Sequence, residues 1–256
     1  MRTVSFLSAA SIAVLVALAP AQAQQPGEPI NPSLTPAPTG EGGPASAYAW
    51  AGGWFSNHYA GGYAGIMKAL NDSDDLWSDG FSFRVDGSGG SYTYDSMGFN
   101  NINVDTYDVD AMIGYRAKVN KGMFSIYVGP TYQSHDNPDP AADIRGSEFG
   151  AKVLADISGP LADNLDGYAQ GSFSTAFSTY SLTGRLLWHV SDTVWLGPQA
   201  TLFGNNAPYS ESTFGPYLKF NTNFGEIGVA AGYRHAYTSG HSDGYFATIY
   251  LGLPIQ

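Results

Sequence analysis

The chain has 256 residues, of which 43% are hydrophobic and 13% are charged. Because 22 Asp and Glu residues outnumber 11 Lys and Arg residues, the net charge is −11, which argues against binding to nucleic acid through a basic surface. The chain has 0 Cys, which excludes disulfides, thiolate metal sites and a cysteine nucleophile. The 32 Gly, 17 Tyr and 14 Phe residues favour a sheet with tight turns over a helical bundle.

The first 46 residues are typical of an exported protein with a linker. Residues 1–23 carry a positive charge, an apolar stretch from Phe6 to Ala19 and the small-x-small sequence Ala21-Gln22-Ala23. This pattern predicts a signal peptide cleaved near Ala23, because a membrane anchor needs about 20 apolar residues. Residues 24–46 are rich in Pro and small polar residues and are predicted to be a flexible, disordered linker.

From about residue 47 to the end, apolar residues alternate with polar or small ones. The clearest run, from Tyr107 to Val119, has apolar odd positions and even positions that include Asp108 and Arg116. This period predicts β-strands with two different faces. Such runs have about 10 to 14 residues, more than the ~5 to 6 of soluble strands and enough for a tilted membrane strand. Residues 47–256 are therefore predicted to be all-β, a single antiparallel up-and-down transmembrane β-barrel.

We expect about twelve strands, within a range of ten to fourteen. Their predicted bounds are 59–70, 77–86, 89–95, 105–118, 121–134, 145–157, 165–176, 179–190, 193–204, 211–221, 224–237 and 243–254. Residues 47–55 are an additional candidate strand. Tight joints alternate with longer ones, which predicts short periplasmic turns, longer outer loops and both chain ends in the periplasm.

Several short motifs in a fixed order carry a resemblance. They are Tyr63-Ala64-Gly65, Asp79-Gly80-Phe81, Tyr92-Thr93-Tyr94, Tyr127-Val128-Gly129-Pro130, Trp195-Leu196-Gly197-Pro198-Gln199, Gly232-Tyr233 and Gly244-Tyr245-Phe246. Together they resemble the cellulose biosynthesis protein BcsS family of alphaproteobacteria, from about residue 47 to the end. Gln199 departs from the acidic residue expected there, and Tyr209 is not followed by the expected Arg.

The resemblance implies an outer-membrane protein encoded with bacterial cellulose synthesis, without enzymatic activity and without known catalytic residues. Outer-membrane lipids are its expected surroundings, and cellulose or the cellulose secretion machinery are its candidate partners. The main alternative is a general small-solute porin. Lower alternatives are an outer-membrane lipid or glycan hydrolase and a soluble β-sandwich that binds glycans.

Charged residues on one face of the predicted strands are the candidate functional residues, because this face lines the lumen if the apolar face meets lipid. The predicted lumen set is Arg84, Asp108, Asp110, Arg116, Lys118, Glu148, Lys152, Asp156, Arg185, Lys219 and Arg234. Two interpretations stay open: a salt-bridged network that fills the barrel, or a polar passage or glycan contact surface. The five Trp residues are expected in an aromatic girdle, with stacking on sugars as the alternative.

No catalytic residue, metal site or cofactor is predicted. A Ser and His hydrolase is disfavoured because no nucleophile elbow is recognised and His189 and His235 have no evident acidic partner. The acidic segment that contains Asp72 and Asp79 lacks the residue order of an EF-hand calcium loop. We expect it to be a solvated outer loop.

Overall fold

A computed structural model of the protein describes residues 45–96, 99–205, 209–237 and 242–256. Within these ranges the strands are β1 Ala47–Ser56, β2 Tyr59–Ala69, β3 Gly80–Ser96, β4 Phe99–Val119, β5 Gly122–Asp136, β6 Gly146–Ala162, β7 Leu165–Ser174, β8 Tyr180–Ser191, β9 Val194–Gly204, β10 Ser210–Thr222, β11 Gly225–Ala236 and β12 Gly244–Ile255. A single 3-10 turn, Ala176–Ser178, joins β7 to β8. No helix in the described ranges is long and apolar enough to cross a membrane.

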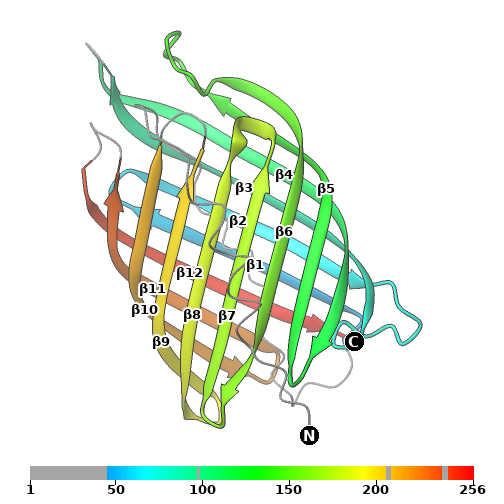
Figure 1. Cartoon of the computed structure of the whole chain (residues 1–256). Helices are drawn as coiled ribbons and strands as arrows, with labels where there is room; N and C mark the ends of the chain where they lie inside the picture. The colour runs from blue at the N-terminus through cyan, green and yellow to red at the C-terminus, as the bar shows by residue number, and fades with distance from the viewer. Residues whose placement is uncertain (1–44, 97–98, 206–208, 238–241) are drawn as a thin grey trace, which may run out of the picture.

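The twelve strands form one closed barrel (Figure 1), in which every strand pairs antiparallel with its neighbours in sequence. β1 closes the barrel against β12, with Ala47 opposite Ile255. The predicted all-β, antiparallel, up-and-down barrel is confirmed. The β-sandwich alternative is wrong, because a sandwich has two separate sheets and this sheet closes on itself.

The strand number was predicted correctly, but by two errors that cancel. Residues 47–55, treated as an additional candidate, belong to β1, and the predicted strands 77–86 and 89–95 are one strand, β3. Gly87 and Ser88 fell between the two predicted strands, yet both continue the pairing of β3 with β4. Pairing with the neighbouring strand therefore carries the chain through a predicted break.

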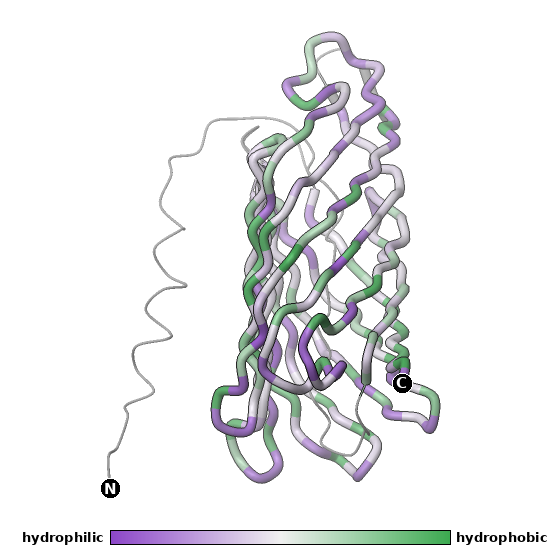
Figure 2. The backbone as a smooth tube through the Cα atoms, turned by 90° about the vertical axis from the view of Figure 1, so that its right-hand side faces the viewer, coloured by the Kyte–Doolittle hydropathy of each residue, from purple (hydrophilic) through white to green (hydrophobic). Residues whose placement is uncertain are grey.

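Outward-facing side chains form an apolar belt around the barrel. Large apolar side chains such as Val109, Ile113 and Val128 are exposed on the outer wall. In Figure 2, hydrophobic and hydrophilic positions alternate along the strands, as period two requires. Aromatic residues border the belt near both barrel ends, as in membrane barrels. They are Phe55, Tyr107, Phe149, Phe214, Tyr233 and Tyr245 near one end, and Phe81, Tyr115, Phe124, Trp188 and Phe220 near the other.

We call the end where β1 begins and β12 ends the terminal end, and the opposite one the far end. β3 to β6 have 15 to 21 residues and rise as a taller wall at the far end (Figure 1), whereas the other strands have 10 to 13. Short turns such as 120–121 and 192–193 lie at the terminal end, as expected. The acidic segment 70–79 lies there too, so its expected place among the longer loops is wrong. The twelve predicted strands did not include β1. Because β1 precedes this segment, the chain crosses the barrel once more before reaching it, which places the segment at the opposite end.

Candidate functional site

The interior of the barrel contains most of the residues predicted to line the lumen. Nine of the eleven side chains are buried or nearly so inside it: Arg84, Asp108, Asp110, Arg116, Lys152, Asp156, Arg185, Lys219 and Arg234. They alternate with outward-facing apolar residues on six strands, β3, β4, β6, β8, β10 and β11. Period two thus places their side chains on the inner face.

Lys118 and Glu148 do not belong to this buried set. Both are exposed, because each lies near the end of its strand and therefore at a mouth of the barrel. The backbone N–H of Lys118 donates to Asp79 Oδ1 at 2.6 Å, and Glu148 Oε2 accepts the N–H of Phe177 at 2.7 Å. Period two carries no information on height in the barrel, so it could not separate these two residues from the nine buried ones.

The wall formed by β3 to β6 holds the densest charge cluster. Arg84 donates from Nε and Nη2 to both carboxylate oxygens of Asp86, at 2.6 and 2.9 Å. Lys152 of β6 pairs with Asp110 of β4, across the intervening strand β5. Both pairs are buried, so each charge depends on its partner for compensation.

Arg116, at the terminal end of β4, is held in a different way. Its Nη1 donates to the sulfur of Met67 at 3.1 Å and to Tyr127 Oη at 3.5 Å, and its guanidinium lies 5.6 Å from the ring centroid of Trp77. Among the described residues, no carboxylate lies within ion-pair distance of Arg116, which is only 1% exposed. The side chain is stabilised by polarisable neighbours instead of an opposite charge.

The opposite wall, from β8 to β11, pairs charges with aromatic rings. Arg185 Nε donates to Gln199 Oε1 at 2.7 Å, and its guanidinium lies 4.2 Å from the ring of Tyr217 and 5.0 Å from that of Tyr168. Gln199 is the position where the family resemblance led us to expect an acid. The neutral amide still orients Arg185, and the two rings supply attraction that does not depend on a carboxylate.

Two further cations on this wall have acidic partners. Arg234 donates from Nη1 to Glu211 at 2.9 Å, and Lys219 lies 3.9 Å from Glu226 and 4.4 Å from the ring of Trp195. Glu226 also accepts the hydroxyls of Tyr48 and Tyr250, each at 2.9 Å. These contacts connect β1, β9, β10, β11 and β12.

Three buried acids on the strands were missing from the predicted set, namely Asp86, Glu211 and Glu226. Each acid alternates in step with a predicted cation on its own strand, so both side chains point to the same face. The pairs are Asp86 with Arg84, Glu211 with Lys219, and Glu226 with Arg234. Applying the alternation to every position of each strand would have found all three.

Side chains from strands that are not neighbours also meet on the inner side of the barrel. Tyr127 of β5 donates to the sulfur of Met67 of β2 at 2.8 Å. Arg84 of β3 lies 4.9 Å from the ring of Trp50 of β1, and Arg234 of β11 lies 6.0 Å from that of Tyr59 of β2. These contacts join strands that are two or three positions apart around the barrel.

The five Trp residues do not all occupy the predicted girdle. Trp50, Trp54 and Trp195 are buried in the interior, which contradicts the prediction for them, and Trp77 lies in the 70–79 segment. Trp188 is exposed on the outer wall, as a girdle residue would be. The interior indoles serve as packing surfaces for cations such as Arg84 and Lys219.

The segment 70–79 folds inward at the terminal end. Leu76 is buried, and its N–H donates to the carbonyl of Ala45 at 2.9 Å. Burial alone would raise the pKa of Asp75, but hydrogen bonds from the Trp77 N–H, the Ser78 hydroxyl and the Ala45 N–H lower it below its ordinary value. The ionised carboxylate therefore helps to hold this segment in place.

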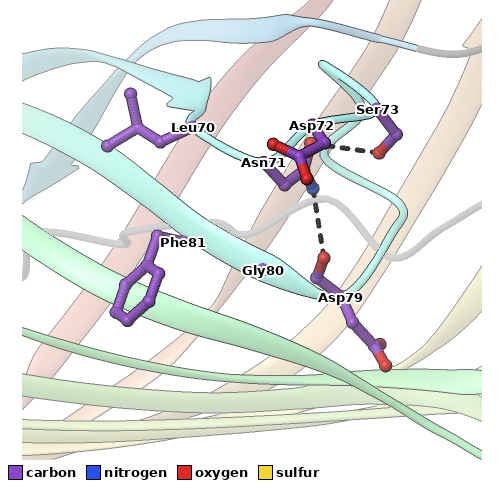
Figure 3. A pocket seen from close by; sticks show the side chains of 7 residues that line it. All are labelled: Leu70, Asn71, Asp72, Ser73, Asp79, Gly80 and Phe81. Atoms are coloured by element: carbon purple, nitrogen blue, oxygen red, sulfur yellow. Dashed lines mark hydrogen bonds between the residues drawn. The ribbon is translucent and has the colours of Figure 1, made fainter.

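A shallow hollow lies on the outer side of this segment. Its walls include Asn71, Asp72, Asp79 and Phe81, and Asn71 Nδ2 donates to the carbonyl of Asp79 at 3.3 Å (Figure 3). Within the described ranges, no three His, Cys, Asp or Glu side chains are arranged to hold a metal ion. The hydrogen bonds of this acidic segment stabilise its own fold.

At the far end, the β7–β8 turn closes toward the β5–β6 wall. Phe177 has φ 47°, a left-handed conformation that costs free energy in a residue other than Gly. Its ring meets that of His135 edge-on at 4.9 Å, and Glu148 accepts its N–H. These contacts compensate the unfavourable backbone conformation.

Two histidines on the strands have acidic neighbours, as a hydrolase histidine does. Contrary to the prediction, His189 and His235 do have acidic partners, Asp166 at 2.9 Å and Asp243 at 2.8 Å. Neither histidine hydrogen-bonds a serine in the described part of the chain. A catalytic triad needs both contacts on one imidazole.

One Gly-x-Ser-x-Gly match was overlooked in the sequence, around Ser242. Ser242 Oγ lies 2.7 Å from His58 Nε2, but among the described residues no carboxylate hydrogen-bonds His58. A nucleophile elbow also stands between a strand and a helix, whereas Ser242 precedes the barrel strand β12. The pair lacks the third member and the setting of a triad.

Comparisons with known proteins were made for the whole chain. The family model for cellulose biosynthesis protein BcsS matches residues 48–254. No curated protein matches the chain.

Among solved structures, a KdgM porin is 10% identical, with a TM-score of 0.49, covering 82% of this chain and 99% of the porin. The translocator domain of the autotransporter NalP from Neisseria meningitidis is 11% identical, with a TM-score of 0.45, covering 85% of this chain and 90% of that domain. A Pseudomonas aeruginosa FadL homologue is 10% identical, with a TM-score of 0.42, covering 77% of this chain and 68% of the homologue. Structural similarity at this level of identity does not show which substrate this chain binds.

Proposed function

Because the chain belongs to the cellulose biosynthesis protein BcsS family, we propose that it is a non-enzymatic outer-membrane barrel accessory to cellulose biosynthesis or export. The observation that carries the proposal is the family match over residues 48–254, which spans nearly the whole barrel. The apolar belt between two aromatic rows supports a place in a membrane. The signal peptide predicted for residues 1–23 supports export, with cleavage near Ala23 and residues 24–46 as a linker.

On this proposal, no polysaccharide passes through the barrel. Buried ion pairs such as Arg84 with Asp86, and contacts such as Tyr127 with Met67, favour a network that fixes the shape of the barrel. A passage for a sugar chain needs a continuous row of exposed polar groups instead. Contacts with glucan chains or with the secretion machinery then lie on the outer surfaces of the barrel.

Deletion of the gene in a cellulose-producing bacterium that encodes this protein tests the accessory role. We expect less cellulose from the deletion strain, with recovery when the wild-type protein is restored. A barrel carrying Lys219→Met and Glu226→Gln should also restore cellulose, because this pair lies in the interior. The restored proteins should fractionate with the outer membrane and shift on unheated gels. Unchanged cellulose in the deletion strain would contradict the proposal.

A further inference from the structure

An aromatic patch covers the outer wall of β10, β11 and β12 at the far end. Phe214, Tyr233 and Tyr245 form one row across the three strands, because Phe214 lies opposite Tyr233 and Tyr233 lies opposite Tyr245. Their exposed fractions are 62%, 54% and 63%. Since neighbouring strands lie about 4.8 Å apart, the row forms an apolar strip of roughly 10 Å. Tyr237, above the row, is 59% exposed.

Polar groups fix the upper edge of this row. His235 stacks with Tyr233 at 6.5 Å and meets Tyr237 edge-on at 4.7 Å. Asp243 accepts hydrogen bonds from the Tyr233 hydroxyl and from His235 Nδ1, the latter at 2.8 Å. The Tyr233 hydrogen bond is the main reason that the pKa of Asp243 lies below its ordinary value. The Asp243 carboxylate therefore holds Tyr233 and His235 in place. Isolated rings in a membrane girdle have no such acceptor.

The negative charge of the far end limits the classes of ligand that the aromatic patch can bind. Exposed acids near this end include Asp105, Asp136 and Asp243, and Arg145 is its one exposed Lys or Arg among the described residues. A phosphorylated or otherwise anionic headgroup would be repelled by this surface. A neutral ligand with apolar faces and many hydroxyls would not be. A β-1,4-linked glucan has both properties and is extended and flat.

We propose that Phe214, Tyr233, His235, Tyr237, Tyr245 and Asp243 form a binding surface for a neutral β-1,4-glucan chain. The pyranose faces stack on the row of rings, and His235 and Asp243 hydrogen-bond sugar hydroxyls. This inference rests on the proposed cellulose role and gives it a surface. It also explains how a barrel with a packed interior can contact the polymer on its outer surface.

The chain offers a matched control on the other side of the far end. Tyr107, Tyr132 and Phe149 also form a row across three strands, with ring distances of 5.8 and 4.7 Å. No His or Asp side chain holds these rings in the described contacts. They represent an ordinary membrane girdle with the same ring types.

Binding of cellohexaose to the full-length protein in detergent micelles tests the inference by isothermal titration. We expect saturable binding that is weaker for maltohexaose, and a loss of about tenfold in affinity for Tyr233→Ala, Tyr245→Ala and His235→Ala. Tyr107→Ala and Tyr132→Ala should stay within about twofold of the wild type. Each variant is first shown to be folded by its shift on unheated gels.

Three results would overturn the inference: no saturable binding of cellohexaose, an equal loss in the control variants, or preferential binding of a lipopolysaccharide core oligosaccharide. If the surface fails while gene deletion still lowers cellulose, the accessory role stands and only this surface is wrong. If deletion leaves cellulose unchanged while cellohexaose binds, the surface stands and the accessory role is wrong.

Discussion

At the scale of single residues, the interior shows how charges are tolerated inside a barrel. Arg84 and Asp86 are 1% and 2% exposed and share two hydrogen bonds. Removing both charges from water costs free energy, which the short bidentate contact and the ring of Trp50 compensate. The effect of such a pair on stability is therefore seen mainly when one partner is removed and the other charge stays buried alone.

Asp86→Asn should therefore lower the free energy of unfolding by about 3 to 5 kcal/mol, because the guanidinium of Arg84 stays buried without its counter-charge. Urea unfolding in lipid vesicles, followed by Trp fluorescence, measures the change. The double variant Arg84→Met with Asp86→Leu should recover much of the loss, since apolar side chains need no partner.

The matched control is the exposed pair Lys68 and Asp74, 3.3 Å apart and 55% and 61% exposed. Asp74→Asn should change the free energy of unfolding by less than about 1 kcal/mol, because water and salt screen the pair. Equal effects of Asp86→Asn and Asp74→Asn would mean that water reaches the interior pair.

At the scale of elements, Gly-Pro pairs mark places where two strands approach closely. The pairing of β8 with β9 is interrupted between Arg185–Gln199 and Trp188–Leu196, at Gly197 and Pro198, while the register is the same on both sides. Pro198 has no N–H to donate, so the ladder is interrupted there. A Cβ on Gly197 would lie 1.7 Å from the carbonyl oxygen of Leu186.

Gly197→Ala should destabilise the barrel by about 1 to 3 kcal/mol, since backbone cannot move aside as a side chain can. The urea midpoint in vesicles reports the change. Gly184→Ala on β8 is the control, because an added Cβ would lie 4.0 Å from the nearest atom, the carbonyl oxygen of Tyr168, and it should leave the midpoint nearly unchanged. Similar midpoints for Gly197→Ala and wild type would show that the two strands separate at this point.

At the scale of the whole molecule, the interior contacts bear on conduction. Side chains of β5 and β2, of β3 and β1, and of β11 and β2 meet inside the barrel. Leu76 packs inward at the terminal end, and Phe177 does so at the far end. Arg84, Asp110 and Arg116 are at most 1% exposed, so the packed interior leaves little room for an ion around these side chains.

The purified protein in a planar bilayer should therefore give no steady open-state current, with a general porin in the same bilayer as the positive control. Brief spikes are compatible with side-chain motion. A stable conductance comparable to that of the porin would favour the small-solute porin over the accessory barrel.

The sequence by itself determined the class of fold and a strand face on which most of the buried charges lie. Alternation with period two follows from strand geometry, which is local, so it predicted strands of membrane length and an inner face with Arg84, Arg185 and Arg234. The recurring motifs also predicted the family to which the chain belongs.

Only the tertiary structure decided which charges meet and at what height. The pairing of Arg234 with Glu211, the exposure of Lys118 and the terminal-end position of segment 70–79 depend on how strands are staggered and where the barrel closes. Stagger and closure are set by hydrogen bonds between residues far apart in the chain, such as Ala47 and Ile255. The alternation of residues along a strand does not predict stagger or closure, because it repeats identically at every height of the strand.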